Sequence, residues 1–162
     1  MSRNRQVERL MSDRNEVDVQ IDEAFAGAVN AQQIEQHITR TLRSVAPDAP
    51  ASFTVTITDD ATIQTLNRDY LGIDAPTDVL AFSQVEGAAL PAPVAGPRYL
   101  GDVIVSYERA VAQAAEYDEP VERELDRLVI HGTLHLLGYD DQHAAERDRM
   151  WEIQESIVTS EQ

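Results

Sequence analysis

The chain has 162 residues, of which 43% are hydrophobic and 26% charged, values typical of one globular domain. It has no cysteine, hence no disulfide framework or thiolate zinc site, and no apolar run approaches the roughly 18 residues that span a bilayer. The net charge is −16, with 13 basic residues, all arginine, against 29 acidic ones. This argues against indiscriminate binding to phosphate backbones, but not against one localised patch. Because the N-terminus also lacks the apolar segment of a secretory signal, we expect a cytoplasmic protein.

The first half of the chain contains two predicted strands and the helix between them. Residues 1–16 are charged without apolar periodicity and are predicted to form a flexible extension, within which Met11 is an alternative start. Strict apolar–polar alternation then predicts a half-buried strand over 17–22. Apolar residues at helical spacing predict a helix over 30–45, and β-branched content predicts a second strand over 52–58.

The second half alternates differently, with two strands followed by consecutive helices. Either Asp59 or Asp60 caps a helix, and strands are predicted over 78–83 and 99–106, separated by a Pro/Gly/Ala-rich loop over 84–98. Helices follow at 107–117, 120–137 and 144–158, the last with Met150, Trp151 and Ile157 available for the core.

Four strands and about five helices in this order predict one α+β domain over residues 17–160. We expect a mixed four-stranded sheet with the helices packed on it. The sequence has no internal repeat that would indicate a solenoid.

The stretch that carries chemistry is HGTLHLLGYDDQH. His131 and His135 are four residues apart on a predicted helix, so both imidazoles project from one face and can reach one metal ion. Gly138 ends that helix and lets the chain turn back, which brings Asp141 into reach as a third ligand. The spacing H-x3-H-x2-G-x2-D is that of a zincin-like metal helix.

The third ligand is open between two residues. Asp141 lies six residues after His135, but an aspartate just before a helix is also a favoured N-cap. His143 is the alternative ligand, although on this prediction it already belongs to the next helix.

The residue after the first histidine separates two classes of metal enzyme. Peptidases with this spacing place glutamate there as the general base, and this chain has Gly132. A peptidase is therefore disfavoured.

Three motifs resemble the YbeY family of endoribonucleases in ribosomal RNA maturation, and they occur in the family's order. HGTLHLLGYD is similar to the family pattern H-G-x-L-H-L-x-G-Y-D-H, and LNRDYLGIDAPTDVLAFS is similar to L-N-x-x-Y-R-x-x-x-x-P-T-D-V-L-S-F. YLGDVIVS is similar to its L-G-D-I-x-I strand. The resemblance covers roughly residues 17–158.

The resemblance implies a mixed four-stranded sheet with flanking helices and one zinc ion, held here by His131, His135 and Asp141. It implies cleavage of single-stranded ribosomal RNA, maturation of the 3′ end of 16S rRNA, and a part in ribosome quality control. The implied partners are the small ribosomal subunit and its assembly factors, with no role on DNA or at a membrane.

Two departures from the family pattern affect the expected site. The family's final motif histidine aligns with Asp141, and an arginine thought to serve RNA cleavage aligns with Leu71. Arg68, one helical turn earlier, is the expected replacement for that arginine. Asp102 is expected in one of two kinds of role. It either serves the metal site, as the proton acceptor or as a hydrogen-bond partner of a metal ligand, or it is a structural carboxylate.

These departures leave two alternatives to the endoribonuclease. One is a ribosome-assembly module that keeps the metal and has lost the chemistry. The other is a metallohydrolase of a different substrate, which Gly132 disfavours.

Overall fold

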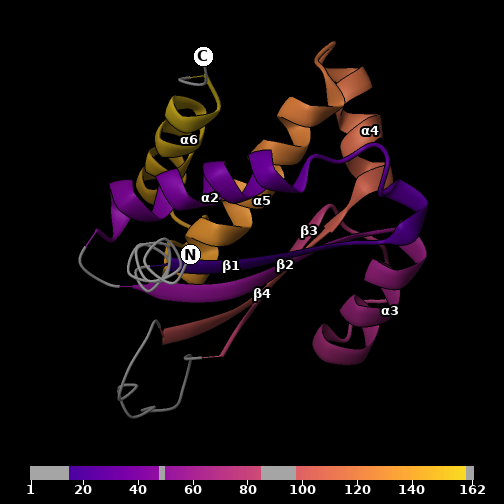
Figure 1. The fold of residues 1–162 in the computed structure, drawn as a ribbon. Helices are drawn as coiled ribbons and strands as arrows, with labels where there is room; N and C mark the ends of the chain where they lie inside the picture. The colour runs from indigo at the N-terminus through magenta and orange to yellow at the C-terminus, as the bar shows by residue number, and fades with distance from the viewer. Residues whose placement is uncertain (1–14, 48–49, 85–97, 160–162) are drawn as a thin grey trace, which may run out of the picture.

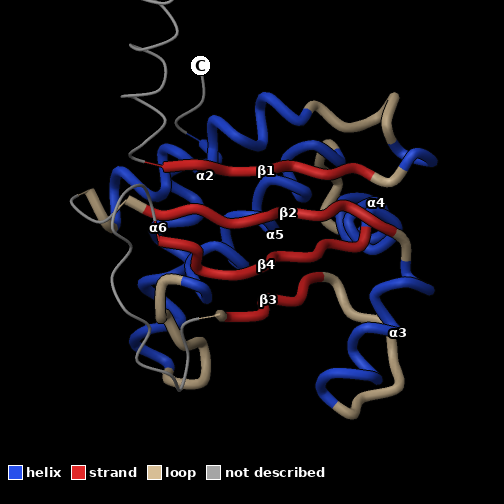
Figure 2. Tube along the Cα trace, turned by 60° about the horizontal axis from the view of Figure 1, so that its bottom comes forward, coloured by secondary structure: helices blue, strands red, loops and turns tan. Residues whose placement is uncertain are grey.

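The computed structural model describes residues 15–47, 50–84 and 98–159. Within them, four strands form one mixed sheet in the order β1-β2-β4-β3 (Figure 2). The strands β1 (Asn15–Ile21), β2 (Ala51–Thr58) and β4 (Arg98–Ser106) are parallel, and β3 (Val79–Ser83) is antiparallel to β4.

The helices lie on both sides of this sheet (Figure 1). Above it in that view are α2, α5 and α6, and α3 lies on the opposite side. Together with the sheet, these helices confirm the predicted α+β class. The helical elements are η1 (Glu23–Phe25), α2 (Ala31–Val45), α3 (Asp60–Leu71), α4 (Tyr107–Glu116), α5 (Val121–Leu136) and α6 (Ala144–Thr159).

Two predicted boundaries fall wholly or partly outside the described residues. Of the expected flexible extension, residues 1–14 are not described, whereas Asn15 and Glu16 belong to β1, so the strand begins two residues earlier than predicted. Most of the expected loop, residues 85–97, is also outside the described part.

Side-chain caps explain where three of the helices begin. The side chain of Asn30 accepts from Gln33 N at the start of α2, and that of Ser106 accepts from Arg109 N at the start of α4. At the start of α3 it is Asp59, not Asp60, that caps the helix, because its carboxylate accepts from Thr62 N at 2.8 Å.

The sheet separates two parts of the core. Val103 and Val105 of β4 face the layer of α2 and α5, and Ile104 between them faces α3. The main cluster also contains the fully buried residues Ile38, Leu42, Phe53, Val55, Ile57 and Val129. None of the helices in the described ranges is long and apolar enough to cross a membrane.

Candidate metal centre

Two histidines lie one turn apart near the end of α5. Val129 and the fully buried Leu134 anchor the helix in the core, and His131 and His135 project beside them. The two Nε2 atoms are 3.1 Å apart, and the rings meet edge to face with centroids 4.7 Å apart. The predicted common face of the two imidazoles is therefore present.

A Schellman turn ends α5 and brings back the third donor. Gly138, with φ of 101°, donates from its N–H to His135 O, and Tyr139 donates to Leu134 O, both at 3.0 Å. Glycine suits this position because a side chain is strained at positive φ. The chain then places Asp141 Oδ2 3.5 Å from His131 Nε2 and 3.6 Å from His135 Nε2.

These distances fit a single cation. Donors about 2.0–2.2 Å from a tetrahedral zinc ion lie about 3.3–3.6 Å apart, close to the three separations found here. The three donor atoms lie within 4.8 Å of one another, and the three side chains are 30–41% exposed, so a cation can enter. The group does not include His143, which is exposed and directly precedes α6.

Hydrogen bonds hold the loop that carries Asp141. Asp140 N donates to the side chain of Glu146, and Gln142 N donates to Asp140 Oδ1 at 2.9 Å. The guanidinium of Arg147 donates to the carbonyl oxygen of Asp141 at 3.3 Å. Asp141 is thus positioned by its neighbours in the loop and in α6, and its carboxylate points to the histidines.

The surroundings of His131 favour the neutral imidazole that metals bind. Burial lowers its pKa from the ordinary value, and the nearby His135 lowers it further. Asp141, Asp78 and a hydrogen bond with Gln154 act in the opposite direction. Gln154 is a buried side chain of α6 that lines the same cavity as His131.

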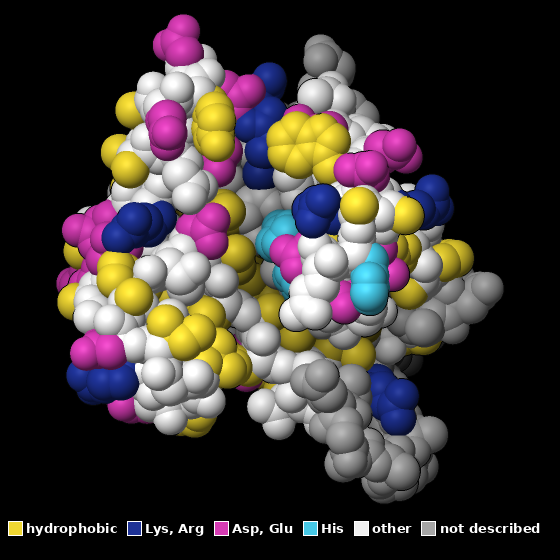
Figure 3. Space-filling view, turned by 180° about the vertical axis from the view of Figure 1, so that it is seen from behind, with side chains coloured by type: hydrophobic (Ala, Val, Ile, Leu, Met, Phe, Trp, Pro, Cys, Tyr) yellow, Lys and Arg dark blue, Asp and Glu magenta, His cyan; other side chains and the backbone are white. Residues whose placement is uncertain are grey.

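Two hollows of about 590 Å³ each meet at this group. From behind, a histidine lies at the wall of a hollow with acidic side chains beside it (Figure 3). We call the two hollows the His131 cleft and the His135 cleft. The His131 cleft is lined by Asp78, Gln113, Tyr117, Glu119, Glu124, Arg127, Leu128, His131, Trp151 and Gln154. The His135 cleft is lined by Val79, Leu80, Ala81, Ser83, His135, Leu136, Gly138, Tyr139, Asp140, Asp141 and Gln142.

Gly132 lies at the contact of α5 with the sheet. A Cβ built there would be 2.5 Å from Val103 Cγ1 and 3.2 Å from Val79 Cγ2. Close packing thus excludes any side chain at this position, including the glutamate that peptidases use as a base.

The structure does not bring the two predicted catalytic residues to the histidines. Arg68 lies in the last turn of α3, pairs with Asp69 at 3.2 Å and lines neither cleft. Asp102 alternates with Val103, whose side chain packs against α5, so it points to the opposite face of the sheet. There it accepts from Tyr99 Oη at 2.9 Å. This placement matches the structural alternative for Asp102.

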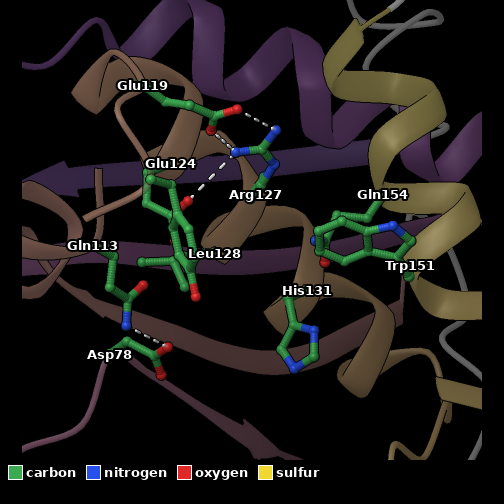
Figure 4. A pocket seen from close by; sticks show the side chains of 10 residues that line it. Asp78, Gln113, Glu119, Glu124, Arg127, Leu128, His131, Trp151 and Gln154 are labelled. Carbon is green, nitrogen blue, oxygen red and sulfur yellow. Dashed lines mark hydrogen bonds and ion pairs between the residues drawn. The ribbon is translucent and has the colours of Figure 1, made fainter. Parts of the chain in front are cut away.

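Several cleft residues were missed from the sequence. Arg127 donates to Glu119, and its Nη1 lies 3.5 Å from Glu124 Oε1 (Figure 4). It also donates to Glu155 of α6. Glu124 and Arg127 are three residues apart on α5, but no local motif marks the whole network, because Glu155 comes from α6.

Of the three residues of α6 available for the core, Met150 and Ile157 are buried, whereas Trp151 is 56% exposed. The signal was available: Met150, Gln154 and Ile157 form the buried stripe of α6 at helical spacing, and residue 151 falls outside it.

Fold and site together define an α+β protein whose metal-competent His/His/Asp group lies where two clefts meet. The sequence profile described as "Endoribonuclease YbeY" matches residues 14–162. The chain therefore belongs to the YbeY endoribonuclease family, which confirms the resemblance.

Individual relatives agree. The chain is 48% identical to "Endoribonuclease YbeY" of Roseiflexus castenholzii over 124 residues, 76% of this chain and 78% of that protein. It is 41% identical to the protein of the same name from Chloroflexus aurantiacus, over 88% of this chain and 93% of the relative. The solution structure of TM1509 from Thermotoga maritima is similar in fold, with a TM-score of 0.53 and 25% identity, over 88% and 86% of the two chains.

Proposed function

We propose that this chain is a zinc-dependent endoribonuclease that cleaves single-stranded RNA. Family membership supports the reaction class, and the observation that carries the metal dependence is the donor set of His131, His135 and Asp141. We further propose that its substrate is ribosomal RNA, including the 3′ end of 16S rRNA. Its place of action would be the small ribosomal subunit with its assembly factors, in maturation and quality control.

The chain's own groups supply orientation and proton transfer. A divalent cation held by the three donors would supply the positive charge that stabilises a phosphodiester transition state and would acidify water. Gln154, buried beside His131 in the same cavity, would help to orient its imidazole toward that cation. We assign proton acceptance to Asp78, which faces His131 across the same cleft (Figure 4). Its carboxylate is oriented by Val79 N at 2.8 Å and by the Gln113 amide at 3.2 Å.

A specific observation also supports one alternative. Leu71 occupies the position of the family's arginine, and Arg68, its expected replacement, pairs with Asp69 away from the clefts. A member that binds metal and assists ribosome assembly without cutting RNA is therefore the second candidate.

The deciding experiment is cleavage of single-stranded RNA by the purified, zinc-loaded chain. The endoribonuclease predicts cleavage that a chelator stops, that zinc restores, and that His135→Ala abolishes. His143→Ala is the matched control, since this exposed histidine is outside the donor group and its loss leaves cleavage unchanged. Asp78→Asn tests the proton acceptor: it should retain zinc and lose most of the rate. Zinc bound without any cleavage would favour the assembly module.

A further inference from the structure

The only tryptophan of the chain stands beside the metal group. Trp151 precedes Gln154 by three residues on α6, and both side chains line the same cleft as His131. Figure 4 shows Trp151 and His131 on adjoining parts of the wall of the His131 cleft. The indole is 56% exposed, although burying so large an aromatic surface is usually favourable. An exposed indole at this place indicates a surface kept for a ligand.

Away from the metal group, the charges of the cleft disfavour a phosphate as the ligand of Trp151. Its cation, Arg127, is engaged by Glu119 and Glu155, whose hydrogen bonds raise its pKa, and Glu124 also lies within 3.5 Å. Asp78 adds a further carboxylate to the lining. Because carboxylates pair with Arg127 and further carboxylates line the cleft, this part of the cleft repels anions. It suits a neutral, flat group that donates hydrogen bonds.

The shape of the cleft fits the same kind of group. Its volume of about 590 Å³ lies within the range of about 300–1,000 Å³ usual for small-ligand sites. A second exposed aromatic ring, Tyr117 at the end of α4, also lines it, so two different helices contribute aromatic side chains. Aromatic rings are the platforms on which unpaired bases of single-stranded nucleic acids stack.

We propose that Trp151 stacks on a nucleobase of single-stranded RNA in the His131 cleft, next to the phosphodiester at the metal group. Trp151 is thus a specificity-determining residue that makes the site select unpaired RNA, because a paired base is not free to enter the cleft. The inference rests on the proposed function, since it takes RNA as the substrate.

Because Trp151 is the sole tryptophan, its fluorescence reports on this contact alone. Titrating the zinc-loaded protein with a short single-stranded RNA should quench the tryptophan emission. The anisotropy of the same RNA carrying a fluorescent label measures binding independently, and the two titrations should have the same midpoint. The fully paired duplex should not quench. Trp151→Ala should weaken RNA binding about tenfold, the order expected for one stacked base, and Trp151→Phe, which keeps a ring, should weaken it less.

Zinc content and circular dichroism of the variants establish that the fold and metal group are intact. Tyr99→Ala is the matched control, because Tyr99 is an exposed aromatic on the sheet face opposite α5, and it should bind RNA as the parent does. If the parent cleaves RNA and Trp151→Ala binds and cleaves equally well, the stacking contact is overturned and the proposed function stands. If the parent binds RNA with quenching but does not cleave it, the stacking contact stands and the proposed nuclease activity is overturned. If the parent does not bind RNA, the stacking contact and the nuclease activity are both overturned.

Discussion

Helix α5 carries two groups built from histidine and aspartate, and they differ in exposure and completeness. His131 and His135 lie with Asp141 at the meeting of two clefts, each 30–41% exposed. On another side of the helix, Asp126 Oδ2 lies 3.1 Å from Nε2 of His37 of α2, and the side chains of Asp126 and His37 are 7% and 3% exposed. At about 100° per residue, Asp126 points about 140° away from His131 and about 180° away from His135.

The contrast shows what makes such a group fit for a cation. The buried pair is almost fully shielded from solvent, and Gln33 Nε2 donates to Asp126 at 3.2 Å. It fastens α2 to α5. The exposed group has three donors with suitable separations and open space on both sides. The same two residue types therefore support folding in one place and ligand binding in the other.

The largest expected effect concerns the third donor of the exposed group. Asp141→Ala should weaken zinc binding by at least about a hundredfold, beyond the usual effect of losing an outer partner, whereas His143→Ala should leave it unchanged. Asp141→His should retain zinc. Competition with a chromogenic chelator measures all three. If His143→Ala released the metal and Asp141→Ala did not, the assigned group would be wrong.

The buried pair should respond in the opposite way. Asp126→Ala leaves His37 without its carboxylate in the core and should lower the free energy of unfolding by about 3 kcal/mol, measured by urea denaturation of metal-free protein. Folded Asp126→Ala should still bind zinc with the parent's affinity. Asp141→Ala is the matched control, because losing this half-exposed carboxylate should cost less than about 0.5 kcal/mol. A loss below about 1 kcal/mol for Asp126→Ala would mean that the pair does not fasten the two helices.

A third difference lies in the response to pH. Burial and the neighbouring His135 lower the pKa of His131 below its ordinary value of about 6.5, so in metal-free protein the unfolded chain takes up this proton first. The contribution of His131 to stability is therefore present above about pH 6.5 and declines as the pH falls from there toward the pKa of the folded state.

Urea denaturation in chelator from about pH 8 to about pH 5 should show this decline. His131→Gln should flatten it, and the difference between the two curves isolates this residue. Identical curves would contradict the depressed pKa. Zinc affinity should likewise weaken only below about pH 6.5, because neutral imidazole is the ligand.

Much of this site was predictable because it is local in sequence. The helical period sets His131 and His135 on one face, and a glycine C-cap returns the chain within a few residues, so the spacing predicted a third ligand after the turn, open between Asp141 and His143. The structure places Asp141 with the two histidines. The four strands and the helices likewise followed from alternation, periodicity and caps, whereas the order of the strands within the sheet was not predicted.

What was not predictable depends on contacts distant in sequence. The face on which Asp102 lies follows from the register of β4 against its neighbours and from the packing of Val103 on α5. The arginine network joins Arg127 to Glu119 and Glu155, which only the docking of α6 brings together. Periodicity within one helix cannot reveal either arrangement.

The smallest expected effect concerns a positive charge near the phosphate, which the exposed group itself does not contain. The buried pair lies in the core between α2 and α5, whereas a site that cleaves RNA also needs a cation near the phosphate. Leu71, half exposed at the end of α3, is the residue that the resemblance aligns with the family's arginine. If that position borders the RNA, Leu71→Arg should strengthen binding a few-fold at low salt. It should also steepen the fall of log affinity with log salt by about 0.7, the value for one added contact to single-stranded nucleic acid.

Val111→Arg adds the same charge at an exposed position of α4 outside both clefts, and is the matched control. An equal gain in both variants would reflect net charge alone, and no gain at residue 71 would show that α3 does not face the RNA.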